Sequence, residues 1–115
     1  MGTQYLNTIM KDNYDINPDD IINYTFKIDS LSFEQLRTRL FMIGTIQFED
    51  QEKRVFLANI KGGFFNLNTA LVGIQLNGSL LYISLYSQEG VISQHTNEGV
   101  INEIKKQLKA FIKDG

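Results

Sequence analysis

Residues 69–87 read T-A-L-V-G-I-Q-L-N-G-S-L-L-Y-I-S-L-Y-S, two runs of strand-forming residues that meet at Asn77-Gly78. Both central positions of a type I′ turn need a positive φ angle, which Asn and Gly tolerate. The segment therefore predicts a β-hairpin with a two-residue loop.

The predicted loop assigns each side chain of the hairpin to one face of the sheet, because side chains alternate along a strand and paired residues share a face. It pairs Val72 with Ile83 and Gly73 with Tyr82. One face is then wholly apolar and must be buried: Ala70, Val72, Ile74, Leu76, Leu81, Ile83 and Leu85. The other face is mixed: Leu71, Gly73, Gln75, Leu80, Tyr82, Ser84 and Tyr86.

We call this mixed side the tyrosine face. Its residues Leu71, Leu80, Tyr82 and Tyr86 make it too apolar to be fully hydrated, and tyrosines are common at protein interfaces and in ligand grooves. Either another part of the chain covers it, or a partner does. The covers within the chain would be a helix over residues 33–40 or the N-terminal segment.

Length and composition indicate one domain over residues 1–115. The chain has 115 residues, 43% of them hydrophobic, which is ordinary for a folded globular domain. Its net charge of −2 gives no electrostatic reason to expect nucleic acid as a partner. Because the chain has no Cys, it has no disulfides, no Cys-based zinc site and no thiol nucleophile.

The sequence also bears on location and origin. No apolar run is long enough to cross a bilayer, and the start M-G-T-Q-Y-L lacks the pattern of a signal peptide. We therefore expect a cytoplasmic protein without membrane insertion. The richness in Asn, Ile, Lys, Phe and Tyr suggests an AT-rich coding sequence, which fits a bacterium of low GC content or its phage.

The N-terminal third predicts a helix, a loop and a strand. Residues 2–12 have apolar pairs at i,i+4 spacing and Thr3 as a cap, which favours a short helix. In the polar loop that follows, Asn17-Pro18 has the form of an N-cap and first residue of a helical turn. Residues 22–29 alternate apolar and polar, which predicts a half-buried strand.

The middle of the chain predicts a helix followed by a run of strands. Ser32 and Gln35 have the capping-box spacing, so we expect a helix over residues 33–40 and then a strand to Glu49. A turn at residues 50–52 leads into a strand over residues 53–61. Gly62-Gly63 is a second candidate turn, after which Phe64 and Phe65 begin the way back to the central hairpin.

The last segment is the clearest helix. It begins at a cap provided by Thr96 or Asn97. Its apolar stripe consists of Val100, Ile101, Ile104, Leu108, Phe111 and Ile112. Its lysine side is typical of a solvated face that favours the negative end of the helix dipole, although an anionic membrane or partner would also suit it.

The predicted fold class is therefore α+β. An antiparallel β-meander of four to six strands is packed by the amphipathic C-terminal helix, with a shorter helix near residues 33–40. If residues 31–40 formed a strand instead, a run of strands would be closed by a C-terminal helix. That order of elements resembles the bacterial pleckstrin-homology-like arrangement.

No motif in the chain carries a reaction. Residues 15–20 resemble the start of an EF-hand loop, but the positions that need Gly and bidentate Glu hold Asp20 and Phe26. His95 is the only histidine, and Lys61-Gly62-Gly63 lacks the rest of a phosphate-binding loop. We therefore expect no catalytic residues, no metal site and no cofactor.

We interpret the chain as a non-catalytic binding protein that acts through the tyrosine face or a strand edge, on another protein or a second copy of itself. One alternative is a module that binds a small molecule or lipid head group on the concave side of a curved sheet, with Phe64, Phe65 and Tyr86 near the mouth. A small enzyme is the alternative with the least support.

Overall fold

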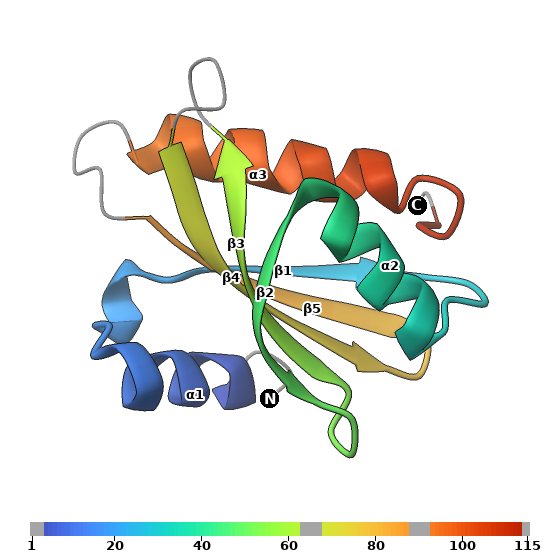
Figure 1. Cartoon of the computed structure of the whole chain (residues 1–115), viewed down its shortest axis with the longest axis horizontal. Helices are drawn as coiled ribbons and strands as arrows, with labels where there is room; N and C mark the ends of the chain where they lie inside the picture. Colours follow the sequence, from blue (N-terminus) through green and yellow to red (C-terminus); the bar gives the residue numbers. More distant parts are fainter. Residues whose placement is uncertain (1–3, 63–67, 88–92, 114–115) are drawn as a thin grey trace.

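Five antiparallel strands form one sheet within residues 4–62, 68–87 and 93–113, the part of the chain that this computed structural model describes (Figure 1). Their order across the sheet is β1-β5-β4-β3-β2. The strands are β1 (Ile22–Lys27), β2 (Gly44–Asp50), β3 (Val55–Gly62), β4 (Asn68–Asn77) and β5 (Leu80–Tyr86). The helical elements are α1 (Gln4–Tyr14), the 3-10 turn η1 (Pro18–Asp20), α2 (Phe33–Ile43) and α3 (Ser93–Gln107). The predicted α+β fold class is confirmed.

Strands β2 to β5 form a meander, and β1, the first strand in the chain, pairs with the last strand, β5. Ile22 pairs with Leu85 and Lys27 pairs with Leu80, so β1 lies beside β5 at one edge of the sheet. The C-terminal segment then follows the outer side of β1 at its end, where Ile28 and Ile112 form an antiparallel bridge. At the opposite edge, no strand of the described chain pairs with the outer side of β2.

The central hairpin forms, but its pairing differs from the predicted one by two residues. Val72 pairs with Leu85 and Gly73 with Ser84, so Tyr82 does not lie opposite Gly73. The loop is Gly78-Ser79, and only Gly78 has a positive φ, +61°. A positive φ at the first loop position is the pattern of a II′ turn, which needs Gly only there, so this turn is formed instead of the I′ turn.

A shift of two residues leaves every hairpin side chain on its predicted face, because the side-chain period of a strand is two. The wholly apolar face is buried as expected, and packs against α3 and α2 in the larger core. Ile74 and Ile83 face each other at its centre and are fully buried. From α3, this core takes Val100, Ile101, Ile104 and Leu108.

Helix α1 covers the other face of the sheet, so helices lie on both sides (Figure 1). A smaller core there joins Met10 of α1 to Ile16, Ile21, Leu57 and Leu71. Helix α1 contributes two fully buried side chains to this cover, Leu6 and Met10.

Several predicted boundaries move. Residues 41–43 continue helix α2 instead of starting a strand, so the strand over residues 31–40, on which the likeness to the pleckstrin-homology-like order of elements depended, does not form. Helix α3 begins at Ser93, so Thr96 and Asn97 lie inside it and are not its caps. The turn before β3 extends to Arg54, which has a φ of +58°. The predicted turn at Gly62-Gly63 falls at the boundary of the segment 63–67, which lies outside the described residues.

Candidate functional site

The structure places the tyrosine face largely under helix α1. Leu71 is buried in the smaller core, and Tyr86 packs against that core and is half-buried. A side chain at Gly73 would meet Met10 Sδ at 3.3 Å and Leu6 Cβ at 3.4 Å, because α1 crosses the sheet directly above this glycine. Of the two covers that the sequence left open, the N-terminal segment is therefore the one that lies on this face.

A polar cluster fixes α1 to the same face. The Ser84 hydroxyl is fully buried and lies 2.9 Å from the side-chain amide of Asn7 and 2.7 Å from that of Asn23. These three residues come from β5, α1 and β1, so the cluster joins the N-terminal helix to both strands at that edge. A buried polar group that is satisfied in this way favours one position of the helix over its alternatives.

The remaining predicted site residues are not brought together into one surface. Leu80 and Tyr82 are half-buried at the turn end of the hairpin, away from Leu71 and Tyr86. Phe64 and Phe65 lie outside the described residues. The side chain of His95 does as well, although its backbone belongs to α3.

Among the described residues, the most exposed large apolar side chains lie elsewhere, at the end of α2. Phe41 is 65% exposed and Met42 is 71% exposed, and Phe48 on β2 is 37% exposed. Leu36 and Leu40 turn the buried side of α2 to the core, and the next two residues therefore point away from it. Sequence reasoning missed Phe41 and Met42 by assigning them to a strand, although the helical spacing of Phe33, Leu36 and Leu40 already put them off the apolar stripe.

A glycine joins this helix directly to the edge strand. Gly44 ends α2 and begins β2, so no loop separates them. A Cβ at Gly44 would lie 2.3 Å from the Asn59 carbonyl oxygen, a separation that no side chain permits. The close approach of backbones holds the end of α2 against the edge of the sheet.

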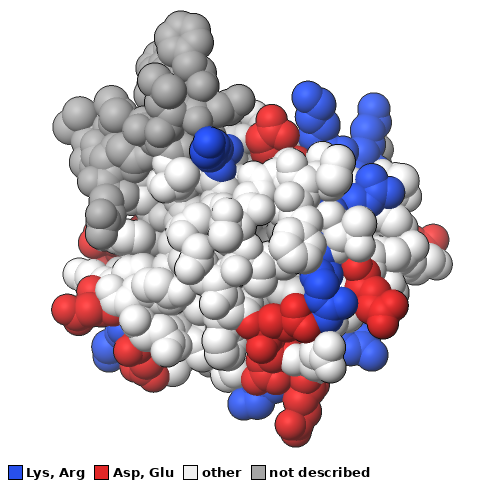
Figure 2. Space-filling view, in the orientation of Figure 1, with Lys and Arg blue, Asp and Glu red and all other residues white. Residues whose placement is uncertain are grey.

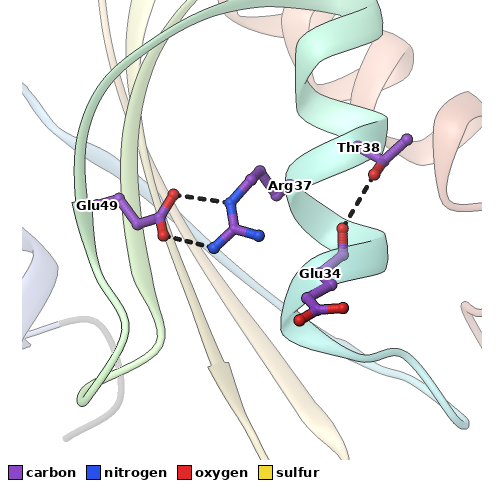
Figure 3. Close-up of polar contacts among 4 residues, drawn as sticks. All are labelled: Glu34, Arg37, Thr38 and Glu49. Carbon is purple, nitrogen blue, oxygen red and sulfur yellow. Dashed lines mark hydrogen bonds and ion pairs between the residues drawn. The ribbon is translucent and has the colours of Figure 1, made fainter.

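An ion pair closes the space between α2 and β2. The Arg37 guanidinium donates to Glu49 through both Nε, at 2.8 Å, and Nη2, as a two-pronged fork (Figure 3). This hydrogen bonding raises the pKa of Arg37 and lowers the pKa of the Glu49 carboxyl. The Arg37 guanidinium also lies 5.3 Å from the centre of the Phe33 ring, which stacks on Phe56 of β3.

A β-bulge places Glu49 on the correct side for this ion pair. Ile46 pairs with Ala58, but Phe48 pairs with Leu57, so Gln47 is the extra residue. The bulge turns Glu49 to the side of Phe56, where α2 lies, and turns Phe48 to the opposite side of the sheet. The edge of β2 is therefore flanked by Phe41 on one side and Phe48 on the other.

We define the α2–β2 surface by the exposed residues Phe41, Met42, Thr45, Gln47 and Phe48. All five are uncharged. Figure 2 shows an uncharged area across the middle of the molecule, where β2 and the end of α2 that joins it lie in Figure 1, with charged side chains around it. An uncharged centre with a charged rim is the usual anatomy of a protein interface.

The described residues contain no group of three or more His, Asp or Glu side chains placed to hold a metal ion. The loop that resembles an EF-hand has a structural use, because Asn17 Oδ1 accepts the Asp19 N–H at 3.0 Å and caps η1. None of the described helices has the length and apolar character needed to cross a membrane. No protein-family model matches the chain, and a search of curated proteins finds no similar sequence.

Proposed function

We propose that this chain is a non-catalytic binding protein that acts through the α2–β2 surface and that its partner is a second copy of itself. The observation that carries the proposal is the exposure of Phe41 and Met42 beside the outer edge of β2. Adjacent large apolar side chains at these exposures cost free energy in water, and burial against a partner removes that cost.

A second copy is the partner that best suits this surface. A twofold symmetric contact brings each residue of a surface near the same surface of the other copy. The uncharged centre of the α2–β2 surface can meet itself without bringing like charges together. A strongly charged surface would instead favour a partner of opposite charge.

The contact is expected to rest on side chains more than on a continuous ladder between strands. The bulge at Gln47 interrupts the regular edge of β2, and such bulges protect edges from open-ended strand pairing. A short pairing over residues 44–46, covered by Phe41 and Met42, would give a closed dimer.

The tyrosine face is the less favourable alternative for binding. Its residues Leu71 and Tyr86 already pack against the smaller core under α1, so a partner would have to displace that helix. Binding of a small molecule or lipid head group near Phe64 and Phe65 stays a prediction from the sequence. The cytoplasmic location and the bacterial origin stay predictions of the same kind.

Solution mass tests the proposal. Light scattering after size exclusion should give about twice 13.2 kDa for the wild type, with the dimer fraction rising with concentration. The double variant Phe41→Gln, Met42→Gln should be a monomer, because Gln keeps helix propensity but removes the apolar area. The matched control Tyr14→Gln, Ile22→Thr alters side chains that are 42% and 40% exposed elsewhere, and should remain a dimer.

Two results would contradict the proposal. One is a wild-type chain that stays monomeric at all concentrations tested. The other is a dimer whose dissociation constant is unchanged by the substitutions at Phe41 and Met42, or is equally changed by the control pair.

A further inference from the structure

The C-terminal half of α3 and the turn after it present a cluster of lysines around a hollow. The hollow has a volume of about 370 Å³ and is lined by Asn102, Lys105, Lys106, Lys109 and Ile112. The only charged groups among its lining residues are the three ammonium groups. Figure 2 shows Lys and Arg side chains gathered at the upper right, over this part of α3, although the whole chain has a net charge of −2.

Carboxylates do not neutralise this cluster within the described chain. The one ion pair among the described residues is Arg37–Glu49, which lies between α2 and β2. Glu103 is three residues before Lys106 on α3, a spacing that allows a pair, but the two groups form none. The nearby Asp29 carboxylate accepts instead from the Ser30 hydroxyl at 3.4 Å.

Two carbonyl groups at this end of the chain are satisfied without the lysines. The Ile104 carbonyl accepts the Leu108 N–H at 3.0 Å, and the Leu108 carbonyl accepts from both Phe111 and Ile112. Backbone groups of the turn therefore satisfy these two carbonyls, a task that lysine side chains perform in other helices. The negative end of a helix attracts cations, but this attraction does not explain why three lysines surround one hollow.

The spacing of the lysines is unfavourable without an anion. Lys105, Lys106 and Lys109 line the same hollow, so like charges lie near one another. The Lys105 Nζ lies 6.0 Å from the centre of the Phe26 ring on β1, at the outer limit of a cation–π contact. A bound anion would relieve the repulsion among the three ammonium groups.

We propose that this hollow binds a ligand that carries at least two phosphate groups. A phosphate group has a charge of about −1.5 to −2 near neutral pH, so two of them match three lysines. Lysine binds phosphate as a point charge without a fixed geometry, and the Asn102 amide adds a neutral donor. Ile112 gives the hollow one apolar wall. The volume of the hollow is of the size that holds a small molecule.

The test uses two sources of the same chemistry. Titration calorimetry with inorganic tripolyphosphate measures binding of a free ligand. Sedimentation with phosphatidylcholine vesicles that contain a phosphatidylinositol bisphosphate measures binding of a head group. We expect saturable binding with one site per chain in at least one of these, and the arm that binds identifies the source.

Paired variants separate the hollow from general charge. Lys106→Gln with Lys109→Gln should weaken binding at least tenfold, because two of the three ammonium groups are lost. Lys11→Gln with Lys61→Gln removes the same charge at exposed positions on α1 and β3, and should leave affinity within about twofold. All four positions are exposed, so equal unfolding midpoints in urea are expected for both variants.

The proposal fails if neither tripolyphosphate nor the vesicles bind. It also fails if both paired variants lose affinity equally. A third contrary result is that phosphatidylserine vesicles of the same total charge bind as tightly as the vesicles with phosphatidylinositol bisphosphate. Tighter binding to duplex DNA than to tripolyphosphate would overturn it in favour of a nucleic-acid surface. None of these results depends on whether the α2–β2 surface forms a dimer.

Discussion

Replacing Gly44 with alanine tests the junction between α2 and β2. A Cβ at this position would lie 2.3 Å from the Asn59 carbonyl oxygen and 2.9 Å from Ile60 Cγ1, whereas ordinary contact begins at 3.4 Å. Both neighbours are on β3, and Ile60 is the ladder partner of Gly44. Room for the methyl group can therefore be made only by opening the ladder between β2 and β3.

The expected cost is at the upper end of what overpacking produces. Inserting one methylene into a packed site costs about 1–3 kcal/mol, and flexible neighbours reduce that cost. Here the nearest atom is a backbone oxygen, so we expect a loss of about 3 kcal/mol in the free energy of unfolding. With a slope of about 2 kcal/mol per molar urea, the midpoint of unfolding should fall by about 1.5 M.

Gly78 provides the matched control. It has a φ of +61°, but a Cβ there would meet nothing within 4 Å. Gly78→Ala should cost about 1 kcal/mol through the backbone angle alone. Urea unfolding followed by circular dichroism measures both variants. If Gly44→Ala is no more destabilising than Gly78→Ala, the close approach of α2 to β3 is refuted.

Three further predictions concern the cover of the sheet, a helix cap and the ion pair. Leu6→Ala removes a fully buried side chain of α1 and should lower the free energy of unfolding, measured in urea, by about 3 kcal/mol. A loss below about 0.5 kcal/mol, as expected for an exposed side chain, would mean that α1 does not cover the sheet. Ser32→Ala removes the side chain that accepts the Gln35 N–H at 3.0 Å and should cost about 1 kcal/mol, with Ser32→Asp close to wild type. Arg37 lowers the pKa of Glu49, so the stability from this pair is present above the unfolded carboxyl pKa of about 4.3 and is lost as pH falls through the lower folded value. The difference in urea midpoint between wild type and Glu49→Gln should therefore be present near pH 7 and vanish near pH 2; a difference that does not change with pH contradicts this.

Short-range chemistry made several elements predictable from the sequence. The capping box forms as expected, with Ser32 N–H donating to Gln35 Oε1 and Gln35 N–H donating to Ser32 Oγ. The cap at Asn17 forms as well. In each case donor, acceptor and backbone lie within three residues, so the rest of the fold has little influence.

The misplaced features depend on partners far along the chain. Turn chemistry alone predicts a loop at Asn77-Gly78, whereas pairing of β5 with β1 adds a constraint that the hairpin alone lacks. The cover of the tyrosine face depends on contact between α1 and strands more than 50 residues away, for example Asn7 with Ser84. The α2–β2 surface was missed because residues 41–46 are strand-forming in composition, while the capping box and Leu40 extend the helix through Ile43.

The pairing of the first strand with the last has a consequence for synthesis on the ribosome. Residues 22–27 leave the ribosome early but have no ladder partner until residues 80–86 follow. The hairpins between β2 and β4 join neighbours in sequence and can form first. We therefore expect nascent chains that end before β5 to leave β1 unpaired, and to depend on chaperones during translation more than the finished protein does.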